Sequence, residues 1–99
     1  MHVGKFLSIS TAHITYEDSL VLARLTGDSG FAVSDNDYGW HICVHEDRAE
    51  LEENQKRYAV AGMSDAFLNI LEFANDLECE LIALDQDGAI YPYIEQFDW

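Results

Sequence analysis

Positive charge is what this sequence has least of. It contains five lysines and arginines against nineteen aspartates and glutamates, giving a formal net charge of −14 at pH 7. Tyr58 to Trp99 holds nine carboxylates and no cation, and Leu25 to Asp47 holds five more, again without a lysine or arginine. Like charges in one small domain repel one another and destabilise the compact state. We therefore expect the excess to serve binding to a strongly basic partner, and the commonest basic surfaces are those that hold nucleic acid.

Other absences narrow the function further. The chain has no long apolar run and no basic, apolar, cleavable start, so we expect a cytoplasmic protein. Its charge disfavours direct contact with nucleic acid or with an anionic membrane. Phosphate-binding glycine loops are missing, and we expect no cofactor. The two cysteines, Cys43 and Cys79, are predicted to be buried thiols rather than a disulfide, because disulfides are rare in the cytosol.

The acidity has a second possible origin in adaptation to salt or a need for solubility. The two origins differ in a measurable way. A salt-adapted fold needs high salt to stay folded, whereas a fold whose charge is directed at a partner does not.

The apolar residues, 48% of the chain, suffice for a core, so residues 1–99 are expected to form a single acidic domain. Thr15 and Asp18 form a capping box before an apolar stripe that stops at Gly27. The polar residues 47–57 have acid–base pairs at spacing four, as in a solvated helix. Ser64 precedes the clearest amphipathic helix, Asp65 to Leu77.

Five strands are expected, over Lys5 to Ser10, Phe31 to Ser34, Tyr38 to His45, Glu80 to Asp85 and Ala89 to Tyr91. Asp35-Asn36-Asp37 has the turn chemistry of a hairpin. Glu80 to Asp85 is apolar enough to be a central strand, Asp87-Gly88 turns it back, and Pro92 places the last strand at an edge. The predicted fold class is α+β: an antiparallel or mixed sheet of about five strands with two or three helices packed on one face.

Three patterns invite a chemical interpretation. His41, Cys43 and His45 alternate on a strand and would project together, as zinc ligands do, with His13 or a carboxylate as a fourth ligand. Against this, one strand cannot surround a metal ion, and Cys43 can instead pack under a helix. We therefore predict no metal site and keep these residues as its candidates.

The other two patterns concern catalysis. Leu84 to Gly88 (LDQDG) resembles the phosphatase loop of the haloacid dehalogenase superfamily, which implies an aspartate nucleophile and magnesium. The long downstream body and lysine of that superfamily are absent, so we favour a plain turn. Ser8, Ser10, Thr11 and His13 lack the glycine-flanked elbow of a serine nucleophile. We predict that the protein is not an enzyme.

The chain ends in a segment, Tyr91 to Trp99, that mixes aromatic residues with acids. We favour packing of these aromatics against the core over an exposed binding face. For the surface that contacts the partner, the predicted residues are the carboxylates around the hairpin and along and after the third helix: Asp28, Asp35, Asp37, Asp65, Glu72, Asp76, Glu78 and Glu80.

Three short segments are similar to those of a small bacterial family of unknown function whose members have about this length: Ser10-Thr11-Ala12-His13-Ile14-Thr15, Tyr38-Gly39-Trp40, and Leu84 to Gly88 with the closing Asp98-Trp99. Members of that family occur on plasmids, phages and other mobile elements, often near antirestriction genes. The resemblance implies a role against host defence in a bacterial cell and assigns no catalytic residue.

Charge and resemblance lead to one main hypothesis. The protein is predicted to be a non-enzymatic inhibitor that mimics DNA and occupies the basic nucleic-acid-binding surface of a CRISPR effector or restriction enzyme. An adaptor or antitoxin-like module that binds another basic protein is the first alternative, and a small metal-binding protein is the second.

Overall fold

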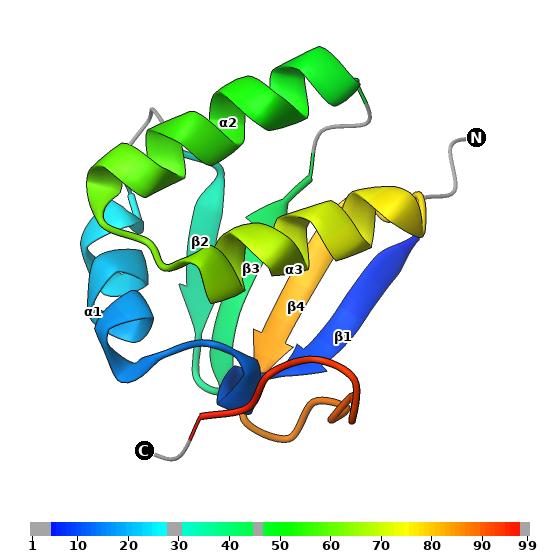
Figure 1. The fold of residues 1–99 in the computed structure, drawn as a ribbon. Coiled ribbons are helices and arrows are strands. Elements are labelled where there is room, and N and C mark those ends of the chain that lie inside the picture. The colour runs from blue at the N-terminus through cyan, green and yellow to red at the C-terminus, as the bar shows by residue number, and fades with distance from the viewer. Residues whose placement is uncertain (1–4, 28–30, 45–46, 98–99) are drawn as a thin grey trace.

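The computed structural model describes residues 5–27, 31–44 and 47–97. The chain forms β1 (Phe6–Ser10), the short 3-10 helix η1 (Thr11–His13), α1 (Tyr16–Leu25), β2 (Val33–Asn36), β3 (Gly39–Cys43), α2 (Arg48–Ala61), α3 (Asp65–Asp76) and β4 (Leu81–Asp85). Within these residues, four strands make one mixed sheet and the three α-helices lie on one of its faces (Figure 1). The fold is α+β, as the sequence predicts.

The sheet has the order β1-β4-β3-β2, with β1 parallel to β4 and the other two pairs antiparallel. Ile82 on β4 lies between Leu7 on β1 and Ile42 on β3. The apolar strand β4, predicted over Glu80 to Asp85, is therefore central in the sheet, which confirms the prediction.

The predicted fifth strand, Ala89 to Tyr91, is not a strand in the structure. A turn does follow β4, because the Gly88 N–H donates to the Asp85 carbonyl at 2.9 Å. Both edges of β4 are already paired, however, so no place is left for an antiparallel return strand. The chain instead crosses the end of β1, where the Ser10 N–H donates to the Ala89 carbonyl at 2.8 Å, and Pro92 lies in a later turn rather than at a sheet edge.

The hairpin turn begins two residues later than predicted. β2 continues to Asn36, which pairs with Gly39, and the turn itself is Asp37-Tyr38. Gly39 fixes this register, because a Cβ at that position would lie 1.8 Å from the Leu84 carbonyl oxygen. Only glycine permits so close an approach of two backbones.

Helix positions follow the capping residues. Thr15 and Asp18 form the predicted capping box of α1, and Ser64 caps α3 by accepting from the Phe67 N–H. α2 runs four residues beyond its predicted end and stops at Gly62, whose φ of 109° is left-handed. The extension brings Tyr58 into the core.

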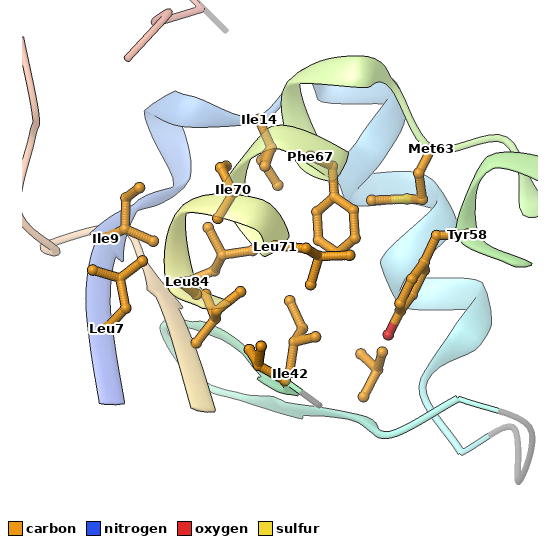
Figure 2. Packing of buried hydrophobic residues seen from close by; sticks show 14 of the residues in the cluster. Leu7, Ile9, Ile14, Ile42, Tyr58, Met63, Phe67, Ile70, Leu71 and Leu84 are labelled. Atoms are coloured by element: carbon orange, nitrogen blue, oxygen red, sulfur yellow. The ribbon is translucent and has the colours of Figure 1, made fainter. Parts of the chain in front are cut away.

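The core lies between the helices and one face of the sheet (Figure 2). The Tyr58 ring packs between Phe31 and Phe67, with both centroid distances 5.0 Å. Phe6, His41 and Cys43 lie on the opposite face of the sheet and are exposed, because no described helix covers that face.

Candidate functional site: an acidic cleft beside the hairpin

The negative charge is unevenly divided among the elements. Residues 47–61, which hold α2 and its cap, carry four acids and three bases, so the rest of the chain has fifteen acids and two bases, Lys5 and Arg24. α2 is therefore close to neutral, and the surplus charge belongs to the sheet, the other two helices and the connecting segments.

Lys5 and Arg24 both donate to helix ends. The Lys5 ammonium donates to the Leu77 carbonyl at 3.0 Å, at the end of α3. The Arg24 guanidinium donates to the Ala61 carbonyl at 2.5 Å, at the end of α2. A cation at a helix C-terminus offsets the partial negative charge of the last carbonyls. These two cations thus compensate backbone dipoles that the fold itself creates.

Arg48 has a different role, because it joins α2 to α3. Its guanidinium lies 2.5 Å from the Glu72 carboxylate and 3.4 Å from the Glu52 carboxylate. The Glu72 hydrogen bond raises the pKa of the Arg48 guanidinium above its ordinary value, and the charges of Glu52 and Asp76 add to the effect. Glu72 also accepts from the Gln55 amide at 3.2 Å. Of the predicted contact carboxylates, Glu72 is therefore already paired within the protein.

The remaining predicted contact residues do not form one surface. Asp35 and Asp37 lie at the hairpin, where the Gln86 N–H donates to the Tyr38 carbonyl at 3.0 Å. Glu78 and Glu80 precede β4 and lie at the opposite end of the sheet, where the Glu80 N–H donates to the Lys5 carbonyl at 2.8 Å.

Two more of the predicted contact residues, Asp65 and Asp76, lie on α3, at its start and at its end. Asp65 lines a groove of about 530 Å³ between α2 and α3, together with Lys56 and Leu68. Asp76 is exposed near the end of α3. Asp28 lies outside the described residues.

The hairpin end holds the better-formed acidic site. A cleft of about 370 Å³ opens there, and we call it the hairpin cleft. Its walls come from η1, α1, the β2–β3 hairpin and the residue after β4: Thr11, Ala23, Asp35, Asp37, Tyr38, Gly39, Trp40 and Gln86. Asp35 lies directly opposite Trp40 in the β-ladder. Asp35 and Asp37 are both exposed. No lysine or arginine lines the cleft.

The two carboxylates of the cleft were predicted from the sequence, whereas its aromatic side chains were not. Tyr38 is 57% exposed, whereas Trp40 is half-buried against the core. The sequence did show both residues, around Gly39 and next to two aspartates. What it did not show is that Thr11 and Ala23, far away in the chain, complete the walls.

Three of the candidate catalytic residues, His13, Ser10 and Asp85, make structural hydrogen bonds. His13 is fully buried; its Nδ1 donates to the Glu95 carbonyl at 2.9 Å, and its Nε2 accepts from the Tyr91 N–H at 3.0 Å. With both nitrogens engaged, His13 is neither a base for a serine nor a fourth metal ligand. Ser10 Oγ accepts from the Ala12 N–H and Asp85 Oδ1 from the Asp87 N–H, so both cap turns.

Two of the three candidate metal ligands lie within the described residues. His41 and Cys43 share the exposed face of β3, and His45 lies outside the described residues. In the described part of the chain, no three His, Cys, Asp or Glu side chains are grouped so that they could hold a metal ion. The expectation of two buried thiols is wrong for Cys43 and confirmed for Cys79; both are free. Strand alternation turns Cys43 to the face without helices.

The C-terminal aromatics mostly pack back on the fold, as favoured from the sequence. Tyr91 and Ile94 are half-buried against the core, and Tyr91 donates to the Ser8 carbonyl at 3.2 Å. Tyr93 contacts the rings of Phe73 and Tyr91 but stays 70% exposed. Trp99 lies outside the described residues.

Comparison with known proteins identifies a family. Residues 6–99 match the family model described as the C-terminal domain of a family of unknown function, DUF5983. The chain belongs to this family. No curated protein and no solved structure matches the chain. Membership of DUF5983 brings no assigned activity, so the function rests on the chain's own residues. Among the described helices, none combines the length and apolar character that crossing a membrane requires.

Proposed function

We propose that this protein is a non-enzymatic inhibitor that occupies the basic nucleic-acid-binding surface of a host defence complex, of the CRISPR effector or restriction enzyme type, by mimicking DNA. The observation that carries the proposal is the division of charge. Fifteen of the nineteen acids lie outside residues 47–61. In that part of the chain only Lys5 and Arg24 are basic, and both of them donate to the ends of helices.

The uneven negative charge favours binding to a basic surface above all. Duplex DNA presents about one charge per 1.7 Å of helix axis, and a channel built for that density attracts any surface that reproduces part of it. Complementary potentials accelerate encounter, and a few well-packed contacts then hold the complex. The hairpin cleft offers such contacts, because its carboxylates lie beside Tyr38 and Trp40.

The proposal also explains why the excess charge is retained. Interleaving bases among Asp76, Glu78 and Glu80 would relieve repulsion at the end of α3, where the helix dipole is already negative. Unless the acidity serves salt adaptation or solubility, a protein without a basic partner gains nothing from leaving these carboxylates together.

The experiment begins with capture. Tagged protein is incubated with lysate of bacteria that carry CRISPR and restriction systems, at an ionic strength of about 0.15 M, where long-range attraction between exposed charges is largely screened. Bound proteins are identified by mass spectrometry and then purified. We expect a CRISPR effector or a restriction enzyme, and we expect the protein to inhibit its DNA cleavage in proportion to occupancy.

Competition separates the mimic from an adaptor. A mimic and duplex DNA exclude each other from the target, whereas an adaptor binds a basic protein and leaves its nucleic acid in place. A ternary complex of target, DNA and this protein would contradict the proposal. The metal-binding alternative is tested by elemental analysis of untagged protein.

A further inference from the structure

The hairpin cleft combines two kinds of lining that differ from the rest of the acidic surface. Asp35 and Asp37 supply negative charge, and Tyr38 and Trp40 supply aromatic surface, all around one hollow of about 370 Å³. This volume falls near the lower end of the range of small-ligand pockets, roughly 300–1,000 Å³. Thr11 and Gln86 add polar groups to the wall.

We propose that the hairpin cleft binds the guanidinium group of an arginine side chain presented by a basic protein partner. The inference rests on the proposed function for the class of partner, but not for the chemistry of the cleft. A planar cation can lie on an aromatic ring and, at the same time, donate hydrogen bonds from its edge to carboxylates. Aromatic rings and carboxylates are the two groups that this cleft places together.

A metal ion fits the cleft less well. Of the described residues that line the cleft, two carry carboxylates. A calcium ion takes roughly six to eight oxygen ligands. Among the residues that the structure describes, no third acid, histidine or cysteine lines the hollow. The aromatic surface adds nothing to metal coordination, whereas it stabilises an organic cation.

Arginine fits better than lysine for two reasons. The guanidinium is less strongly hydrated than an ammonium and stacks on aromatic faces, and its fork of N–H groups can reach two carboxylates together. Lysine presents a compact, strongly hydrated charge, which loses more hydration on entering a hollow that is partly apolar.

The structure of the hairpin holds the cleft in shape. Gly39 lies against the Leu84 carbonyl, Asn36 pairs with Gly39, and the Gln86 N–H donates to the Tyr38 carbonyl. The two-residue turn is therefore anchored on both sides, so the backbone that carries the two aspartates is held in place before any partner arrives. Such preorganisation reduces the entropy lost on binding.

The test titrates full-length protein with N-acetyl-arginine amide and with N-acetyl-lysine amide, two probes of equal charge. Chemical shifts of backbone amides and of the Trp40 indole N–H are followed by NMR, and a Trp99→Phe variant assigns the indole signal. We expect saturable shifts confined to the hairpin cleft. The affinity for the arginine probe should exceed that for the lysine probe by about fivefold or more, because the guanidinium also stacks on an aromatic ring.

Variants locate the site. Asp35→Asn with Asp37→Asn is expected to weaken arginine binding about tenfold, and Tyr38→Ala about threefold. The matched control, Glu53→Gln with Glu95→Gln, removes the same charge from exposed positions outside the cleft and is expected to change binding less than about twofold. Equal affinities for the two probes, or an equal loss in the control, would overturn the inference.

The outcomes also separate this inference from the proposed function. If arginine binds in the cleft but duplex DNA never displaces the captured partner, the mimicry proposal fails and the cleft assignment stands. If DNA does displace the partner and Asp35→Asn with Asp37→Asn leaves both partner and probe affinity unchanged, the cleft assignment fails and mimicry stands.

Discussion

At the scale of single residues, Asp18 shows that an acid of this chain need not face a partner. It is 1% exposed, and its carboxylate accepts from the Thr15 N–H at 3.1 Å, the Ser64 N–H at 2.8 Å and the Ser64 hydroxyl at 2.5 Å. One side chain thus joins the start of α1 to the start of α3, where both helix dipoles favour negative charge.

We predict that Asp18→Ala lowers the free energy of unfolding by about 3 kcal/mol, because three donors lose a charged acceptor. Urea denaturation at neutral pH measures the change. Glu17→Gln, an exposed neighbour in the same helical turn, is the control and should change stability by less than about 0.5 kcal/mol. Similar values for the two variants would show that the junction is not stabilised in this way.

Tyr58 carries a buried hydroxyl that has no hydrogen-bond partner among the described residues. Burial, followed by the nearby Cys43, raises the pKa of Tyr58 to about 12 from its ordinary value of 10. Above pH 10 the unfolded chain loses this proton while the folded protein keeps it, so stability falls as the pH rises toward 12.

Tyr58→Phe should remove this alkaline loss of stability, which amounts to about 2 kcal/mol at pH 12. At pH 7 the variant should be as stable as the parent or more stable by up to about 1 kcal/mol, because an unsatisfied polar group is gone. Urea denaturation of both proteins from neutral to alkaline pH gives the comparison. Parallel curves for the two proteins would contradict the assignment.

At the scale of elements, the His13 side chain bonds the C-terminal segment to η1. Figure 1 shows the segment, in red, passing beside this short helix. The Phe97 N–H adds a bond of 2.7 Å to the Ala12 carbonyl. Because Nε2 accepts a backbone proton, the imidazole must be neutral in this arrangement.

His13→Ala should therefore release this segment while leaving the sheet folded. We expect amide hydrogen exchange at Tyr91 and Phe97 to accelerate about tenfold or more relative to Ile82 in the central strand. His41→Ala, a change at an exposed histidine, should leave all three amides unaffected. Unchanged protection at Tyr91 in His13→Ala would mean that the segment is held by other contacts.

Elements with local signals were predictable from the sequence. Thr15, Asp18, Ser64 and Gly27 mark helix ends through bonds and dihedral angles within a few residues, so α1 and α3 were placed correctly. The fifth strand was wrong because the pairing of β4 on both edges is a property of the whole sheet. The bond between His13 and Glu95 joins residues 82 positions apart and has no local signal.

The candidate site was predictable to the same degree. Asp35 and Asp37 were found because acids near a hairpin are visible in the sequence. Their relation to Trp40 depends on a register fixed by the backbone contact of Gly39 with Leu84. The separation of Asp35 from Glu80 depends on strand direction, which only the assembled sheet provides.

At the scale of the whole molecule, the fold leaves most of its negative charge uncompensated. A net charge of −14 on a domain with a radius of gyration of 12.5 Å repels itself, and salt screens this repulsion. We predict that the protein is folded at about 0.05 M salt and gains modest stability at about 0.5 M, measured as the urea midpoint. Unfolding at low salt would instead favour salt adaptation as the origin of the acidity.

The most direct measurement of the central claim is the affinity of the protein for its captured target in the presence of increasing duplex DNA. The account predicts direct competition: the apparent Kd rises in proportion to free DNA, and binding weakens steeply with salt. An apparent Kd that stays constant while DNA saturates the target would contradict it.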